Sequence, residues 1–311
     1  MASGARAFGG GLGAAGARRL EAAQVLAALA ALGVDGADPG RWPGLAPPSS
    51  NAPLHGPGQI PVLSPSRVDL LAKCPLAWAL NKAGGSRQAG DRASLGTLIH
   101  QLAETYPEAD PEAMALHLEE RWPELGLADT YSSRRMKDEA KRMARRLGAY
   151  QAAHGLPEGS EVVIKPPGPA GRWRLPVRLA GQIDRLELAE DGRVRIVDFK
   201  TGANPPAVAE AATNPQLGAY QIAINAGLVP PYRAASEAAL VYLSKGARLP
   251  TERRQPPLDQ AENRQWMETL LTQCADDATG PTFEARTGPQ CLNCAVKSSC
   301  PAWPQGKQVI A

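Results

Sequence analysis

The sequence predicts an α/β fold, a short mixed sheet flanked by helices, with a helical N-terminal part. Helical periodicity prevails from Arg18 to His154, whereas short apolar runs typical of strands follow from Glu161 onward. The turn Glu190-Asp191-Gly192 joins two of these runs as a hairpin. A helix-length segment before the last run predicts a crossover connection, so the sheet should contain both parallel and antiparallel neighbours.

Composition sets broad limits on the class of protein. The chain has 311 residues, 43% of them hydrophobic, which is enough for one large domain or two modest ones. The formal net charge of +3 is mildly basic and does not by itself indicate a nucleic-acid partner. No run reaches the roughly 20 apolar residues of a membrane span. The apolar stretch 25–34 fits an ordinary helix better than a signal peptide. We therefore expect a cytoplasmic protein that does not insert in a membrane.

Two regions are expected along the chain. Residues 1–63 should form an N-terminal extension: a disordered Gly/Ala-rich start over 1–17, a helix from Arg18 to Gly33, and a Pro/Gly/Ser-rich linker from Asp35 to Leu63. Residues 64–311 should form the main domain. No phosphate-binding loop with its Lys-Ser/Thr pair is found, so the chain is not itself a complete helicase motor.

Within the main domain, helices should come first and strands later. We expect helices over 64–78, 93–106, 112–121 and 132–154, and another over 207–226. Strands are expected over 161–165, 175–188, 193–201 and 238–244. The helix over 132–154 carries a basic run, which fits either a solvated face or a DNA-backbone face: Arg134, Arg135, Lys137, Lys141, Arg142, Arg145 and Arg146.

Two acidic residues and a lysine on neighbouring strands form the candidate site. Side chains alternate along a strand, so Asp198 and Lys200 face the same way, and Asp184 on the adjacent strand can come alongside. Two carboxylates that close repel unless a cation lies between them, and Mg²⁺ or Mn²⁺ suits their oxygens. Such a metal would polarise a scissile phosphate, with Lys200 neutralising developing charge. The alternative is a surface salt bridge between Asp198 and Lys200.

The segments Ile183-Asp184 and Val197–Gly202 resemble the catalytic motifs of RecB-type nucleases in the PD-(D/E)XK superfamily. Three further segments fit that family in the same order. Gly96–His100, with Glu104 one turn later, resembles its helical histidine motif, Gln216–Gln221 resembles its QxxxY helix, and Glu161 resembles the acidic residue that often opens the core sheet. The resemblance covers about residues 64 to 304.

The resemblance implies a restriction-endonuclease-like core and a role for each matched residue. By that resemblance the metal ligands are His100, Asp184, Asp198 and the backbone carbonyl of Phe199. The catalytic residues are Asp184, Asp198 and Lys200. Gln216 and Tyr220 are implied to contact DNA, and Glu104 and Glu161 are possible further members of the site.

The cysteines indicate a metal site. Their odd number, five, argues against a disulfide framework. Cys291, Cys294 and Cys300 form a CxxCx₅C pattern, and Cys74 lies far upstream. The spacing fits a structural Zn²⁺ or an iron–sulfur cluster. Cys74 opens a segment that matches the first cysteine motif of AddB-like nucleases, and that resemblance implies a [4Fe–4S] cluster. Cys274 fits a small buried residue better than a ligand.

The resemblance implies a metal-dependent DNA exonuclease or endonuclease that acts on single-stranded or unwound DNA ends. It also implies a setting in double-strand-break repair, with a helicase as the expected partner. Two alternatives remain open. One is a catalytically inactive iron–sulfur DNA-binding module of a helicase–nuclease complex, and the other is a nuclease of the CRISPR adaptation type.

Overall fold

The computed structural model describes residues 14–34, 36–38, 51–56, 58–85, 90–166, 175–260 and 265–303. The chain divides into two units, residues 1–51 with 310–311, and residues 52–309. The predicted boundary between extension and main domain, after residue 63, stays a prediction. No helix in the described ranges is long and apolar enough to span a membrane.

The first unit contains helix α1 (Ala14–Ala31). Gly33 follows it with φ +73°, a backbone conformation that favours glycine and ends the helix as the sequence predicts. The expectation of disorder over 1–17 was wrong for its last four residues, because Ala-rich sequence has high helix propensity and α1 already begins at Ala14. The rest of that expectation lies outside the described residues.

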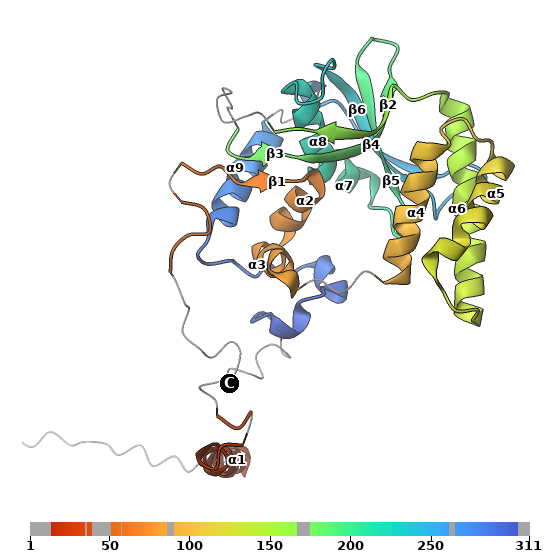
Figure 1. The fold of residues 1–311 in the computed structure, drawn as a ribbon. Helices are drawn as coiled ribbons and strands as arrows, with labels where there is room; N and C mark the ends of the chain where they lie inside the picture. Colours follow the sequence, from red (N-terminus) through yellow and green to blue (C-terminus); the bar gives the residue numbers. More distant parts are fainter. Residues whose placement is uncertain are drawn as a thin grey trace, which may run out of the picture. The chain divides into compact units, whose positions relative to one another are not determined.

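The second unit contains a mixed five-stranded sheet, which Figure 1 shows between the helices of this unit. Its order is β2-β4-β5-β6-β7, and only β5 and β6 are parallel neighbours. The strands are β2 (Gly159–Ile164), β4 (Gly181–Leu188), β5 (Val194–Lys200), β6 (Ala235–Tyr242) and β7 (Thr251–Gln255). A second, two-stranded sheet pairs β1 (Val62–Leu63) with β3 (Arg178–Leu179). The α/β prediction with hairpin and crossover is therefore confirmed.

Helices cover both faces of the large sheet. They are α2 (Pro65–Lys73), α3 (Pro75–Leu80), α4 (Asp91–Thr105), α5 (Pro111–Arg121), α6 (Tyr131–His154), α7 (Val208–Ala212), α8 (Pro215–Asn225) and α9 (Trp266–Thr279). One apolar core lies between the sheet and α2, α8 and α9, and the other between the sheet and α4, α5 and α6. Strand β5 belongs to both cores, with Ile196 in the first and Val197 in the second. Its end is therefore held from both sides.

Several predicted elements are divided in the structure, and proline explains two of the breaks. The expected helix over 64–78 breaks at Cys74, and the expected helix over 207–226 breaks before Pro215. A residue that precedes proline is disfavoured in helical conformation, so each break was readable from the sequence. The expected strand over 175–188 divides into β3 and β4, and the expected linker ends in strand β1. Strand β7 was missed because its sequence, TERRQ, is polar, which is usual at a sheet edge.

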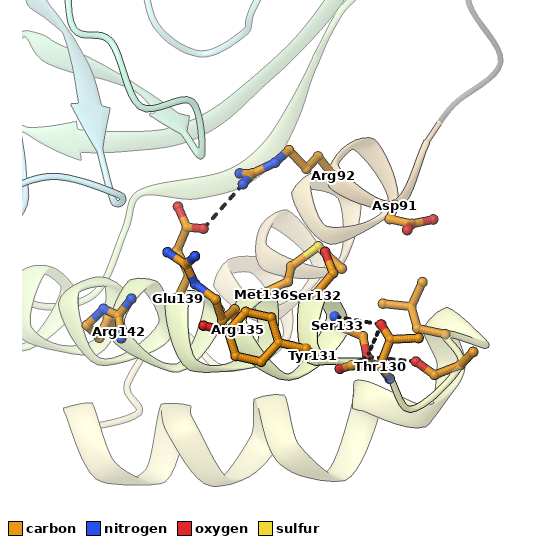
Figure 2. Close-up of a pocket in the computed structure, with 12 residues that line it drawn as sticks. Asp91, Arg92, Thr130, Tyr131, Ser132, Ser133, Arg135, Met136, Glu139 and Arg142 are labelled. Atoms are coloured by element: carbon orange, nitrogen blue, oxygen red, sulfur yellow. Dashed lines mark hydrogen bonds and ion pairs between the residues drawn. The ribbon is translucent and has the colours of Figure 1, made fainter.

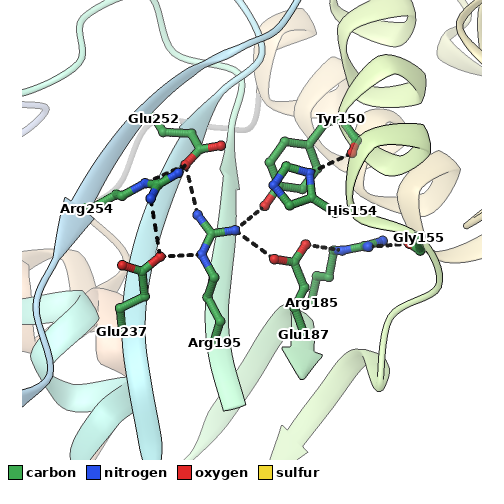
Figure 3. Close-up of polar contacts among 9 residues, drawn as sticks. All are labelled: Tyr150, His154, Gly155, Arg185, Glu187, Arg195, Glu237, Glu252 and Arg254. Atoms are coloured by element: carbon green, nitrogen blue, oxygen red, sulfur yellow. Dashed lines mark hydrogen bonds and ion pairs between the residues drawn. The ribbon is translucent and has the colours of Figure 1, made fainter. Parts of the chain in front are cut away.

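A charged network lies over the sheet face that α6 covers (Figure 3). Arg195 of β5 is at its centre and pairs with carboxylates from β4, β6 and β7: Glu187 at 2.7 Å, Glu237 at 2.6 Å and Glu252 at 2.8 Å. It also donates to the Tyr150 hydroxyl of α6 at 2.8 Å. The network therefore joins four strands to one helix. Arg195, at its centre, precedes Asp198 on β5 by three residues.

Candidate metal-dependent active site

Asp198 and Lys200 lie on the same side of β5, as strand alternation predicts. Asp198 is only 3% exposed, and its Oδ2 atom lies 2.7 Å from Lys200 Nζ. Burial raises the pKa of the Asp198 carboxyl, although the Lys200 ammonium opposes that shift. For Lys200, burial would lower the pKa, but the Asp198 carboxylate holds it above its ordinary value. The lysine is therefore kept protonated beside a crowded acidic group.

Asp184 of β4 connects this pair to helix α4. Its Oδ2 atom accepts a hydrogen bond of 2.6 Å from the backbone N–H of Phe199. Its Oδ1 atom lies 3.3 Å from Nδ1 of His100. The backbone contact fixes the carboxylate beside β5, so the predicted neighbourhood of Asp184, Asp198 and Lys200 is present in the structure.

His100, Glu161 and Asp184 form a compact set of donors. One ligand atom from each lies within 4.8 Å of the others, so the three side chains could hold a metal ion. Asp198 is not a member of this compact set. Burial would lower the pKa of His100, but the hydrogen bond to Asp184 and nearby carboxylates hold it above its ordinary value. The carboxylates around His100 therefore favour a positive charge at this place.

Glu161 occupies an unusual backbone conformation. It lies opposite Asp184 in the β2–β4 pairing, between the partners Ser160–Arg185 and Val162–Ile183. Its φ of +48° falls in the left-handed region, which is rare for a residue other than glycine. Burial and the neighbouring Asp184 carboxylate raise its pKa. A strained residue that points a carboxylate into an acidic cluster is typical of a functional position.

Glu104 lies close enough for its charge to raise the pKa of Glu161 further. It is on α4, one turn after His100, and its side chain is exposed. The structure thus places both possible members of the site near the compact set, Glu161 within it and Glu104 beside it.

Helix α8 brings Gln216 and Tyr220 to Asp198. Asn214 caps this helix and Pro215 starts it, and residues four apart then share one face. The Gln216 amide donates to Asp198 Oδ1 at 2.7 Å and accepts from Lys200 Nζ at 3.0 Å. The Tyr220 hydroxyl donates to the same Asp198 oxygen at 3.2 Å. Both side chains are buried, Gln216 at 9% and Tyr220 at 4% exposed. The sequence did not indicate this contact, because it depends on how α8 packs on β5.

The cysteine segments lie side by side in the structure although they are far apart in the sequence. The Leu76 N–H donates to the Glu284 carbonyl at 3.0 Å, and the Gln290 amide donates to the Lys73 carbonyl at 3.2 Å. Cys74 packs in one apolar cluster with Cys294 and Val296. All five cysteines are free thiols.

Backbone N–H groups point at two of these sulfurs. Ala77 donates to Cys74 Sγ at 3.5 Å, and Gly288 donates to Cys291 Sγ at 3.4 Å. Among the described residues, no three thiols come within 4.8 Å of one another. Cys274 lies elsewhere, in the core against α2, where burial raises its pKa to about 12.

Comparisons with known proteins identify the family to which the chain belongs. No curated protein matches the sequence. A crystal structure of SSO0001 is similar over 64% of this chain and 84% of that chain, with 16% identity and a TM-score of 0.31. The model of the PD-(D/E)XK nuclease superfamily matches residues 62–301, and the mixed sheet flanked by helices is consistent with the restriction-endonuclease-like fold. Since that match spans more than half of the sequence, the chain belongs to the PD-(D/E)XK nuclease superfamily.

Proposed function

We propose that this chain is a metal-dependent deoxyribonuclease that cleaves single-stranded DNA or unwound DNA ends. The observation that supports it most is the convergence of His100, Glu161 and Asp184 within 4.8 Å, next to the buried Asp198–Lys200 pair. A salt bridge alone would need neither a third carboxylate nor a histidine at that place. Membership of a nuclease superfamily agrees with a phosphodiester substrate.

The donor set fits Mg²⁺ or Mn²⁺. Carboxylate oxygens suit both ions, and imidazole is acceptable to Mn²⁺. We propose Asp184, Asp198, His100 and the Phe199 carbonyl as ligands, with Glu161 as a further one. Burial and then the Asp184 carboxylate raise the pKa of Glu161, and a bound cation would offset both effects. When bound, the metal would supply charge for the phosphate and a lowered pKa for a coordinated water.

Lys200 is proposed to act on the phosphate. Asp198 and Gln216 hold its ammonium group from two sides, at 2.7 Å and 3.0 Å. A fixed cation can stabilise charge that develops on the phosphoryl oxygens without reorganising during the reaction. Gln216 and Tyr220 are buried against Asp198, so we propose that they position the acidic group and the lysine, in addition to any contact with DNA.

A cleavage assay tests the proposal. Single-stranded DNA labelled at one end would be incubated with Mn²⁺ or with a chelator, using wild type, Asp198→Asn and Lys200→Ala. We expect cutting only with the metal, and loss of cutting in both variants while DNA binding persists. The matched control is Asp259→Asn, an exposed acid on the surface. Equal cutting by Asp198→Asn and wild type would disprove the assigned site.

We also propose that Cys74, Cys291, Cys294 and Cys300 bind a [4Fe–4S] cluster, for which the resemblance argues. Backbone N–H groups beside Cys74 and Cys291 suit thiolate ligands, since hydrogen bonds to the sulfurs tune such clusters. Four thiolates also suit a single structural Zn²⁺, and metal analysis distinguishes the two centres.

The ultraviolet–visible spectrum of anaerobically purified protein, together with metal analysis, tests the cluster. We expect a brown protein with four iron atoms, and loss of colour in Cys294→Ser. Cys274→Ala serves as the matched control, because that thiol lies in the core and should leave the colour intact. A colourless protein with stoichiometric zinc would identify a zinc site instead.

A role in double-strand-break repair with a helicase is a further part of the proposal, and it follows from the resemblance alone. Such a role predicts that an ATP-dependent helicase co-purifies with the chain from its native cell. Purification of the chain without any associated ATPase would argue against that partner and leave the nuclease proposal unaffected.

A further inference from the structure

The basic run on α6 divides into two sets in the structure. Four of its seven cations are engaged by a carboxylate or a backbone carbonyl: Arg134, Lys141, Arg145 and Arg146. The other three have no ion pair in the part of the chain that the structure describes: Arg135, Lys137 and Arg142. The charges of Arg135, Lys137 and Arg142 are therefore available to an anionic ligand.

Two of these unpaired arginines line a pocket between α4 and α6, which we call the α6 pocket (Figure 2). Arg135 and Arg142 come from α6, and Arg92 comes from the first turn of α4. The volume, about 560 Å³, is in the range of small-ligand sites. Two acids, Asp91 and Glu139, also line the pocket, so its formal charge is +1. The Arg92–Glu139 pair is long, 3.5 Å, and exposed, so an incoming anion could replace it.

An aromatic ring also lines the α6 pocket. Tyr131, the first residue of α6, is 71% exposed, and the Arg135 guanidinium lies 6.0 Å from its ring centroid. An exposed ring beside arginines matches the chemistry of an unpaired base joined to a phosphate, because the ring can stack on the base and the arginines can bind the phosphate. Double-stranded DNA keeps its bases stacked and offers no free base to such a ring.

The basic surface continues beyond this pocket. Arg142 also lines a neighbouring pocket with Arg145, Arg146 and Arg248, and two acids, Asp110 and Glu112, share that pocket. Its four arginines and two acids leave a formal charge of +2. Burial and, after it, the charge of the nearby Arg142 lower the pKa of Arg146. One residue thus links two basic pockets along α6.

Helix α4 connects the α6 pocket to the candidate active site. Arg92 precedes His100 by eight residues, which is about 12 Å along a helix axis. Between them, a Cβ added at Gly96 would lie 3.4 Å from Thr201 Oγ1, so α4 rests against the end of β5 next to Lys200. A single strand lying along α4 would therefore need only a few nucleotides to cover that distance.

We propose that the α6 pocket binds single-stranded nucleic acid and leads the strand to the site at His100. Arg92, Arg135 and Arg142 would bind phosphates, and Tyr131 would stack on a base. The inference rests on the proposed nuclease function and adds where the substrate is held and why it must be unpaired.

Fluorescence anisotropy with the full-length protein in a chelator tests the binding surface, because no cleavage then interferes. The probe is a fluorescein-labelled 20-nucleotide DNA strand, titrated at several salt concentrations. Arg142→Ala should lower the slope of log Kd against log salt by about 0.7, the value for one phosphate contact on a single strand. The matched control is Arg134→Ala, which removes the same charge from the same helix but at a residue paired with Asp129. Equal slopes for the two variants would overturn the proposal.

The ring of Tyr131 is tested by a second pair of variants. Tyr131→Ala should weaken binding of the single strand by about 5-fold or more, whereas Tyr131→Phe should bind as wild type does, because stacking needs only the ring. Duplex DNA should show no such difference. If Tyr131→Ala also weakens binding of an RNA strand of the same sequence, that result would support the proposal too, since DNA and RNA share phosphates and bases. A loss that is equal for duplex and single strand would refute the stacking role.

The two proposals fail in different ways. If Mn²⁺-dependent cleavage is abolished in Asp198→Asn but Arg142→Ala binds like Arg134→Ala, only the α6 pocket is wrong. If wild type binds the strand through the pocket but does not cut it, the nuclease proposal fails and the binding surface stands.

Discussion

The Gln216 amide bridges the two ends of the Asp198–Lys200 pair, with hydrogen bonds of 2.7 Å to the carboxylate and 3.0 Å from the ammonium. Gln216 thereby fixes both groups at once, whereas Tyr220 contacts only the carboxylate. We propose that Gln216 acts on catalysis by orienting the acidic group and the lysine.

Gln216→Ala should therefore lower kcat of metal-dependent cleavage by about 10- to 100-fold, the usual cost of losing a group that orients ligands. Tyr220→Phe keeps the ring and loses the two hydrogen bonds of the hydroxyl, but it leaves Gln216 in contact with both Asp198 and Lys200, so a smaller loss is expected. Cleavage rates measured across a Mn²⁺ titration check this, and DNA affinity measured in a chelator is the accompanying readout. A Gln216→Ala variant that loses DNA affinity but keeps kcat would instead make Gln216 a DNA contact.

The sequence was sufficient for the part of the site that depends on strand geometry. Alternation along β5 placed Asp198 and Lys200 together, and the hairpin brought Asp184 beside them, since Arg185 pairs with Val197. Such relations follow from local periodicity and a tight turn. The position of His100 came from the family resemblance alone, because nothing local relates a helix to a strand formed some 80 residues later.

The remaining parts required packing information. Whether Gln216 touches Asp198 depends on where α8 crosses β5, and the propensities of the two elements do not specify that crossing. The left-handed backbone of Glu161 was also invisible, since glutamate carries no sequence signal for positive φ. By contrast, the breaks at Pro75 and Pro215 carried a local signal.

The protonation of His100 should make the stability of the metal-free protein depend on pH. Its pKa is raised in the folded state, so its contribution to stability is fully present below about pH 6.5, the ordinary value. That contribution is lost as the pH rises through the raised pKa. The difference in Tm between wild type and His100→Asn, measured with a chelator, should therefore shrink as the pH increases. A difference that grows with pH would contradict this assignment.

Metal should reverse that trend. A proton and a metal ion compete for the imidazole, so Mn²⁺ should raise the Tm of wild type more at higher pH. In His100→Asn the stabilisation by Mn²⁺ should be smaller and less dependent on pH. The measurement is a thermal melt with and without Mn²⁺ at each pH.

Arg195, which lies at the centre of the network in Figure 3, should be a major determinant of stability because its side chain is largely buried. Its side chain is 10% exposed and that of its partner Glu187 is 9% exposed. Arg195→Met leaves the buried Glu187 carboxylate with Arg185 as its remaining partner and removes the partner of its Oε2 atom, which should cost about 1–3 kcal/mol of unfolding free energy. Arg254→Met is the control, since that arginine is 59% exposed and pairs with the same Glu252, and about 1 kcal/mol or less is expected. Urea unfolding of both variants measures these losses of unfolding free energy. Similar losses for the two variants would mean that the network contributes little to stability.

Glu161 combines a strained backbone with a proposed metal ligand, and two substitutions separate these roles. Glu161→Ala and Glu161→Gly both remove the carboxylate, so both should lose Mn²⁺ stabilisation equally. Without metal they should differ, because alanine retains the strain at φ +48° and glycine does not. Left-handed backbone costs a non-glycine residue about 1–2 kcal/mol, whereas glycine within a strand costs about 0.5–1 kcal/mol in entropy. The glycine variant should therefore be more stable than the alanine variant by up to about 1.5 kcal/mol in urea unfolding with a chelator. This is the reverse of the order normal for a strand, and finding alanine the more stable would show that the position carries no strain.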